Sequence, residues 1–193
     1  DYYASRGLGD VYKRQHYQSL GTIEYLFADG QFYFMEMNTR LQVEHGVTEL
    51  TTGIDIVAEQ IKQAAGVTVD FPEHVGLQPK CTAIEARLTA TLPFKQTRIE
   101  TLSWPADVRV DTDYHQGDRL VTMYDGLIAK LMVTGANRQQ AVRNLQRALA
   151  QVTLTGPTTN LTFLQQTVAR PAYIHDQYLS LIHISEPTRR VVI

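Results

Sequence analysis

Residues 34–45 read Phe-Met-Glu-Met-Asn-Thr-Arg-Leu-Gln-Val-Glu-His, with polar residues at the even positions from 36 to 44 and apolar ones at nearly all odd positions. A period of two is typical of a strand, because successive side chains of a strand point to opposite faces. The pattern therefore predicts an extended run with one face toward a core, formed by Met35, Met37, Leu41 and Val43. The opposite face carries Glu36, Asn38, Arg40, Gln42 and Glu44.

Two carboxylates, an amide and a guanidinium on one face suit a site for Mg²⁺, phosphate and a small anion. Hard cations prefer oxygen ligands, and planar oxyanions match a forked donor. The alternative is a half-buried strand with a solvated face, where the same residue types are ordinary.

The preceding residues 21–34 read as two aromatic and β-branched strands around Asp29-Gly30, which predicts a hairpin. A two-residue turn would pair Glu24 with Met35 and leave the two glutamates on opposite faces. A three-residue loop would set Glu24 directly opposite Glu36. We expect a three-residue or otherwise odd loop, which brings together three oxygen ligands, Glu24, Glu36 and Asn38.

These residues resemble the biotin carboxylases, which are ATP-grasp ligases. Their last ATP-grasp hairpin carries a Glu and, twelve residues later, the string Glu-Met-Asn-Thr-Arg-(Leu/Ile)-Gln-Val-Glu-His. That string is intact at residues 36–45, at the matching distance from Glu24, and residues 47–49 and 52–55 continue the likeness. One departure is Gly46, where the family usually has Pro, and it predicts a looser turn at that point.

Both chain ends are predicted to be non-native. Residues 5–15 can be encoded by a nucleotide string whose reverse complement translates as residues 179–189, and the string resembles a transposase adaptor used in sequencing libraries. We therefore expect residues 1–15 and 179–193 to be adaptor-derived and to pack poorly. The native part is then 16–178.

Composition describes an ordinary globular protein, with 44% hydrophobic residues and a net charge of −2. No basic patch predicts nucleic-acid binding, and no apolar run approaches the roughly 18 residues of a membrane span. Cys81 is the sole cysteine, which excludes an internal disulfide, fits a reducing cytoplasm and favours a small core residue.

Two domains are expected, at residues 16–66 and 81–178. The first ends in a helix at 54–65, capped by Thr52 or Asp55 and stopped by Gly66. A connection rich in Pro and Gly follows.

In the second domain, strands are predicted at residues 81–88, 98–102, 108–111 and 127–133, with turns at 104–105 and 116–118. Asn137 caps a helix with an apolar stripe of Ala141, Val142, Leu145, Ala148, Leu149 and Val152, and a second helix runs from 158–160 to Val168. The predicted fold class is α+β: an ATP-grasp terminal hairpin, then an antiparallel sheet with packed helices.

This second half is similar to the carboxyl-terminal domain of biotin carboxylase. The matching motifs lie at residues 83–87, 108–111, 124–125, 127–131, and at Gly156 with 159–160. The chain departs from the family after Leu88, where a longer loop is reduced to residues 89–95.

The resemblance implies a reaction in which MgATP activates bicarbonate as carboxyphosphate and a ureido nitrogen of biotin is then carboxylated. Glu24, Glu36 and Asn38 match the ligands of Mg²⁺ or Mn²⁺. Glu24, Leu26 and Glu36 match residues that bind the nucleotide.

It also implies the substrate contacts. Arg40 matches the residue that binds bicarbonate, together with Gln42 and the Val43 backbone. Glu44 matches the general base, and Arg109 matches the residue that stabilises the biotin enolate oxygen.

Other polar residues are ambiguous or structural. Tyr124, Asp125 and Lys130 fit a core or salt-bridge role as well as a site role. His45 fits a structural hydrogen bond better than a metal ligand.

Residues 16–178 contain no glycine-rich lid, so we expect this piece to be inactive alone. They also contain no Met-Lys-Met biotin signature, so we expect the biotin on another chain or on a lost carboxyl-terminal region. The expected partners of the parent, in the cytoplasm, are a biotin carboxyl carrier protein or domain, further copies of itself and a carboxyltransferase subunit.

Two alternatives stay open. One is a noncatalytic fragment that binds a biotin carrier or pairs with another subunit; the other is a carbamoyl phosphate synthetase-like ligase. The intact acidic and basic residues of 36–45 disfavour the first, and the match of the second half disfavours the other. Whether the parent serves an acyl-CoA, pyruvate or urea system is also open.

Overall fold

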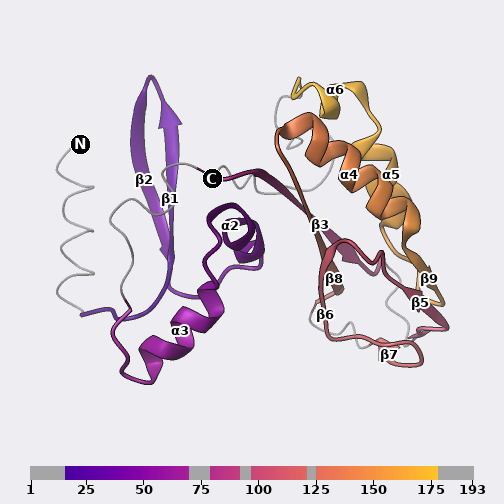
Figure 1. Ribbon diagram of the computed structural model, residues 1–193, viewed down its shortest axis with the longest axis horizontal. Coiled ribbons are helices and arrows are strands. Elements are labelled where there is room, and N and C mark those ends of the chain that lie inside the picture. The colour runs from indigo at the N-terminus through magenta and orange to yellow at the C-terminus, as the bar shows by residue number, and fades with distance from the viewer. Residues whose placement is uncertain (1–15, 70–78, 92–96, 121–124, 178–193) are drawn as a thin grey trace. The chain divides into compact units, whose positions relative to one another are not determined.

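The computed structural model describes residues 16–69, 79–91, 97–120 and 125–177. The chain forms two compact units (Figure 1). Among the described residues, one hydrogen-bonded sheet lies in the first unit and three lie in the second. The first contains the described residues up to His45 and those from Ile54 to residue 69; the second contains Gly46–Gly53 and the described residues from 79 onward.

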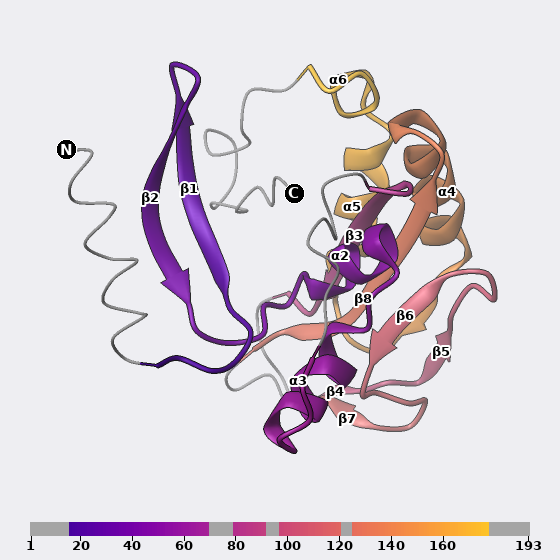
Figure 2. The same cartoon turned by 60° about the vertical axis from the view of Figure 1, so that its left-hand side comes forward.

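The first unit is built on the antiparallel hairpin of β1 (Thr22–Ala28) and β2 (Gln31–Asn38) (Figure 2). Asp29 and Gly30 have φ values of 50° and 74°, and a type I′ turn requires positive φ at both central residues. Ala28 pairs with Gln31 across them. The prediction of a three-residue or otherwise odd loop is therefore wrong, because Asp-Gly satisfies the two-residue turn.

A β-bulge on β2 nevertheless sets the expected register between the two glutamates. Tyr25 pairs with Phe34, but the next pair is Glu24 with Glu36, so Met35 is the extra residue. Met35 is 59% exposed, and the prediction that it faces a core is wrong. The bulge supplies the one-residue shift that was expected from the loop.

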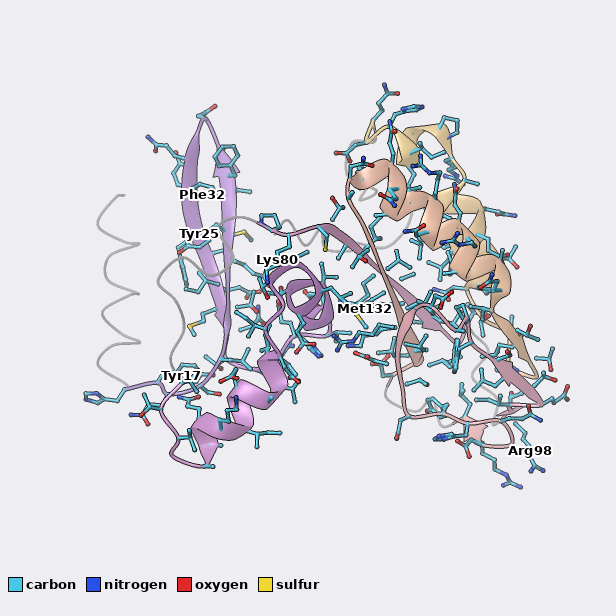
Figure 3. All side chains as sticks on the ribbon, in the orientation of Figure 1. Tyr17, Tyr25, Phe32, Lys80, Arg98 and Met132 are labelled. Atoms are coloured by element: carbon cyan, nitrogen blue, oxygen red, sulfur yellow. The ribbon has the colours of Figure 1, made fainter. Side chains whose placement is uncertain are left out.

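Contacts between aromatic rings on the two strands stabilise the hairpin. The Tyr25 ring lies edge-on to the Phe32 ring, with centroids 6.0 Å apart (both residues are labelled in Figure 3). It also lies edge-on to the Phe34 ring, with centroids 6.1 Å apart. Such edge-to-face pairs each contribute about 0.5–1.5 kcal/mol beyond area burial.

The extended run ends earlier than predicted. β2 stops at Asn38, residues 39–44 form an irregular turn, and α2 (His45–Thr52) follows. Residues 40–44 therefore do not continue the polar face of the strand. The backbone leaves the extended conformation where the His45 N–H donates to the Gln42 carbonyl at 3.2 Å.

The predicted helix after the motif is present as α3 (Ile56–Ala64). Of the two expected caps the structure uses Asp55, whose carboxylate accepts from the Ala58 N–H at 2.8 Å. Gly66, with φ 77°, follows its end as expected.

The second unit is built on the antiparallel sheet β3-β8-β6, with β8 in the centre. Its strands are β3 (Thr82–Thr89), β8 (Leu127–Gly135) and β6 (Arg109–Thr112). Helices α4 (Arg138–Gln151) and α5 (Leu161–Val168) lie along one side of it (Figure 1). The predicted stripe of α4 is buried in this core together with Ala86, Leu88, Ala129, Leu131 and Val133.

The strand predicted at 98–102 is split into β4 (Thr97–Arg98) and β5 (Thr101–Ser103). β4 pairs with β7 (Arg119–Leu120), whereas β5 pairs with β9 (Thr153–Thr155). The partner changes beside Gly156, which has φ 108° and where a Cβ would overlap the Arg98 carbonyl oxygen. The short helix α6 (Pro171–Ile174) ends the described part.

The α+β fold class is confirmed. Within the described ranges, no helix has the length and apolar character needed to cross a bilayer. Tyr124 and the two end segments, 1–15 and 179–193, lie outside the described residues.

Candidate functional site

The candidate site of the first unit is the acidic pair Glu24 and Glu36, which face each other across the hairpin. Directly opposed residues have Cβ atoms about 4.5–5.5 Å apart, and like charges there are destabilising. Two carboxylates held at this spacing favour a cation between them.

Glu24 is also the acceptor for two amides. Asn38 Nδ2 donates to Glu24 Oε1 at 2.7 Å, and Gln42 Nε2 donates to the same oxygen at 3.3 Å. Gln42 is 9% exposed, so its hydrogen bond to Glu24 is largely shielded from water. A flip of the Asn38 side-chain amide would place its oxygen, in place of its nitrogen, beside Glu24.

This donor set fits Mg²⁺ or Mn²⁺. Among the described residues no three His, Cys, Asp or Glu side chains form a metal cluster, and here the third oxygen would come from Asn38. Mg²⁺ typically takes only one or two protein carboxylates and keeps water or phosphate oxygens as its other ligands. The predicted ligands Glu24, Glu36 and Asn38 therefore meet on one face of the hairpin.

The other predicted site residues of this unit are Leu26, Arg40, Val43 and Glu44. Leu26 is two residues beyond Glu24 on the same face of β1 and is 57% exposed. Arg40 is exposed, and its Nη1 donates to the Leu41 carbonyl at 3.3 Å. Val43 and Glu44 are half-buried in the turn before α2.

His45 has the structural role that was predicted. Its Nδ1 lies 2.8 Å from the Gln42 carbonyl oxygen, which also accepts the His45 backbone N–H. With Nδ1 as the donor, the ring fixes the same carbonyl and so the backbone of Gln42.

A separate candidate site lies in the second unit and is the network around Arg109 on β6. Arg109 Nε and Nη2 donate to Asp111 Oδ1 and Oδ2 at 3.0 Å and 3.2 Å. Arg109 Nη1 lies 2.7 Å from Glu49 Oε2 of α2. The guanidinium is therefore held from two directions while its side chain keeps 34% exposure.

Lys130 completes this network from the central strand. Asp111 is its cross-strand partner, and Lys130 Nζ lies 3.1 Å from Asp111 Oδ2. The salt-bridge role considered for Lys130 is thus observed, with the side chain 9% exposed.

The charges of the network shift two pKa values. The hydrogen bond with Asp111 raises the pKa of Arg109, with Glu49 adding to the effect against a smaller opposing effect of burial. Burial alone would raise the pKa of the Asp111 carboxyl, but the hydrogen bonds from Arg109 and Lys130 outweigh it and lower that pKa. Both groups are held in their charged forms at neutral pH.

Gly46 permits α2 to approach this face of the sheet. A Cβ there would overlap Met132 Sδ (Met132 is labelled in Figure 3), and Met132 is the cross-strand partner of Arg109. Gly46 is buried in α2, so the looser turn expected from this substitution is wrong. Close packing explains the glycine instead.

The sequence analysis did not predict that Glu49 and Asp111 contact Arg109. The contact with Asp111 could have been predicted from the strand pattern, because Asp111 lies two residues after Arg109 and shares its face of β6. The contact with Glu49 could not, since only the packing of α2 brings Glu49 to Arg109.

Two family models match the chain. The model described as biotin carboxylase C-terminal domain matches residues 85–182, and the one described as carbamoyl-phosphate synthase L chain, ATP binding domain, matches 8–71. Both matches run slightly into the segments predicted to be adaptor-derived, and the domain limits at 15 and 178 stay predictions.

Similar proteins agree with these matches. Biotin carboxylase of Haemophilus influenzae is 39% identical over 151 residues, which are 75% of this chain and 34% of the relative. Biotin carboxylase of Allochromatium vinosum is 39% identical over 161 residues, which are 80% and 35% of the two chains. This chain spans about a third of the length of these relatives.

A solved structure is similar over most of the chain. It is the biotin carboxylase domain dimer of the Hydrogenobacter thermophilus 2-oxoglutarate carboxylase, in complex with MgADP, ADP and bicarbonate. The TM-score is 0.80 at 31% identity, and the match covers 93% of this chain and 41% of that one.

Proposed function

Because the chain belongs to the biotin carboxylase family, of which it is a fragment, we propose that it forms part of an active site that carboxylates biotin with MgATP and bicarbonate. The observation that carries this proposal is the bulged register that sets Glu24 opposite Glu36, with Asn38 hydrogen-bonded to Glu24.

Glu24, Glu36 and Asn38 would hold Mg²⁺ or Mn²⁺. When bound, the ion would neutralise negative charge on the nucleotide phosphates during phosphoryl transfer. Leu26 would offer an apolar contact to the nucleotide from the same face of β1. The MgADP in the Hydrogenobacter structure supports this assignment.

Arg40, Gln42 and the Val43 backbone would bind bicarbonate. Arg40 is exposed and makes a single 3.3 Å hydrogen bond to a backbone carbonyl, so most of its donors remain for an oxyanion. Gln42 is oriented at both ends, by Glu24 through its side chain and by His45 through its carbonyl. Such support fixes a binding group before the substrate arrives.

Glu44 would act as the general base that takes the bicarbonate proton. It lies in the turn directly before α2 and is half-buried. A base must be held within hydrogen-bond reach of the proton that it removes. Arg109 would stabilise the negative charge that develops on the biotin ureido oxygen.

The partners of the parent protein follow from the same family membership. The biotin would be presented by a carrier protein or domain, and the carboxyl group would pass to a carboxyltransferase subunit. We propose a homo-oligomeric parent in the cytoplasm, and the dimer in the Hydrogenobacter structure supports the oligomer. The isolated chain is proposed to be inactive, because residues 16–178 include no glycine-rich lid.

A chimera tests this proposal. The matching third of Haemophilus influenzae biotin carboxylase is replaced by residues 16–177 of this chain, and ATP cleavage is measured with bicarbonate and free biotin. We expect turnover that depends on both substrates and that Glu36→Gln strongly reduces, whereas Glu100→Gln at an exposed position leaves it unchanged. A folded chimera that binds MgATP without such turnover would overturn the proposal in favour of a noncatalytic fragment.

A further inference from the structure

We propose that Asp111 and Glu49 are positioning residues that hold the Arg109 guanidinium in one orientation toward the biotin oxygen. This inference rests on the proposed role of Arg109 and deepens it.

The hydrogen bonds fix the guanidinium plane. Asp111 binds the Nε and Nη2 edge with both carboxylate oxygens, and Glu49 binds Nη1. An arginine side chain has five N–H donors, so these three contacts leave one donor on each terminal nitrogen. A plane held at one edge and one end cannot rotate, and the two remaining donors then point in set directions.

Asp111 is itself held in place. Lys130 donates to Asp111 Oδ2 from the central strand, and both residues belong to paired positions of β6 and β8. Glu49 lies on α2, which Gly46 allows to pack closely against Met132. The two carboxylates thus come from rigid elements, which position groups better than loops do.

The charge balance indicates the kind of oxygen that this network would recognise. Arg109 and Lys130 carry two positive charges, and Asp111 and Glu49 carry two negative ones. The network therefore offers directed donors with little net positive potential. That suits a neutral ureido oxygen on which charge develops during reaction better than a free dianion such as phosphate.

A purely structural role makes a different prediction. Ion pairs that only attach α2 to the sheet would, when broken, lower the folded fraction and reduce all activities together. Positioning residues instead affect the step in which Arg109 takes part. The two roles separate when the biotin-dependent step is compared with the earlier step that needs no biotin.

The experiment uses the chimera with Asp111→Asn, Glu49→Gln and Arg109→Lys. We expect Asp111→Asn and Glu49→Gln to lower kcat for biotin carboxylation by about 10–100-fold, the usual cost of losing an orienting partner. Bicarbonate-dependent ATP cleavage without biotin should change less than about twofold. The matched control is Asp113→Asn, which removes the same charge at an exposed position two residues further on.

The outcomes separate the inference from the function on which it rests. Unchanged biotin carboxylation in Arg109→Lys would overturn the role of Arg109 itself. A large loss in Arg109→Lys with none in Asp111→Asn and Glu49→Gln would overturn only the positioning role. Equal losses in both assays would show that the network is structural.

A measurement on the present chain keeps the inference testable if the chimera does not fold. In ¹⁵N NMR of the arginine side chains, restricted rotation of the guanidinium gives separate signals for the Arg109 Nη hydrogens. We expect separate signals in the unsubstituted chain and averaged ones in Asp111→Asn. Averaged signals in the unsubstituted chain would overturn the inference, because the guanidinium would not be held.

Discussion

Glu24 of β1 faces Glu36 of β2 because one residue, Met35, is left out of the pairing between them. The two-residue turn at the tip would otherwise place the glutamates on opposite faces. The acidic pair on which the proposed metal site depends is thus produced by a bulge in the strand.

Glu44→Gln and Glu36→Gln should have different effects in the chimera. Glu44→Gln should leave MgATP affinity nearly unchanged and lower bicarbonate-dependent turnover by about 10²–10⁴-fold, because a base contributes to the proton-transfer step. Glu36→Gln should weaken MgATP binding directly, since a charged oxygen ligand is lost. Calorimetry and steady-state kinetics measure the two effects, and full activity of Glu44→Gln would exclude its role as the base.

Acid should destabilise the second unit partly through Asp111. Its pKa is lowered in the folded state, so its contribution is present above the unfolded pKa of about 3.9 and is lost as the pH falls through the lower folded value. Trp104, the single tryptophan, packs against the core of this unit and reports its unfolding. As the pH falls from roughly 5 to 2, the range in which carboxylates titrate, Asp111→Asn should lose less stability than Asp113→Asn, and parallel curves would contradict the pKa shift.

Gly46→Ala should lower the unfolding free energy of the second unit by about 1–3 kcal/mol, because the added methyl group overlaps Met132 Sδ. The same substitution in a Met132→Ala background should cost much less, since the overlapping atoms are gone. A double-mutant cycle by urea unfolding measures the coupling. No coupling would show that α2 does not depend on this close approach.

Gly156→Ala and Gly117→Ala should separate backbone strain from overlap. Both glycines have positive φ, 108° and 96°, so both substitutions carry a similar strain. A Cβ at Gly156 would also overlap the Arg98 carbonyl oxygen, whereas a Cβ at Gly117 meets only the end of the Arg98 side chain at 3.4 Å. We expect Gly156→Ala to be the more destabilising by about 1–3 kcal/mol in the same Trp104 assay; equal losses would contradict the close approach.

Removal of residues 1–15 and 179–193, the ends predicted to be adaptor-derived, should not destabilise the chain. The free energy of unfolding of a chain trimmed to 16–178 should stay within about 0.5 kcal/mol of the full value, as for changes away from packed features. A larger loss would show that the ends contribute to the folded protein.

Regular periodicity predicted the longest helices and strands of the second unit, namely α4, α5, β3 and β8. The stripe on α4 was predicted correctly because its residues recur at helical spacing, and all of them are buried. α2 was missed because its sequence contains Gly46 and three threonines, which are weak helix formers. Long-range contacts stabilise it, among them the Lys80 N–H to Thr51 carbonyl bond and the Glu49–Arg109 ion pair.

The candidate site was predictable where the motif is local and unpredictable where it depends on packing. Glu24, Glu36 and Asn38 were placed on one face, although through a loop that the chain does not have. The bulge has no sequence signal of its own, because Met35 fits either a paired or an unpaired position.

The bulge sets the register of the two glutamates, whereas the turn at the tip only connects the strands. Since the bulge lies between the tip and the acidic pair, a residue inserted at Asp29-Gly30 lengthens the loop and leaves the pairing of Glu24 with Glu36 as it is. Insertions and deletions among descendants should therefore collect at the tip of this hairpin.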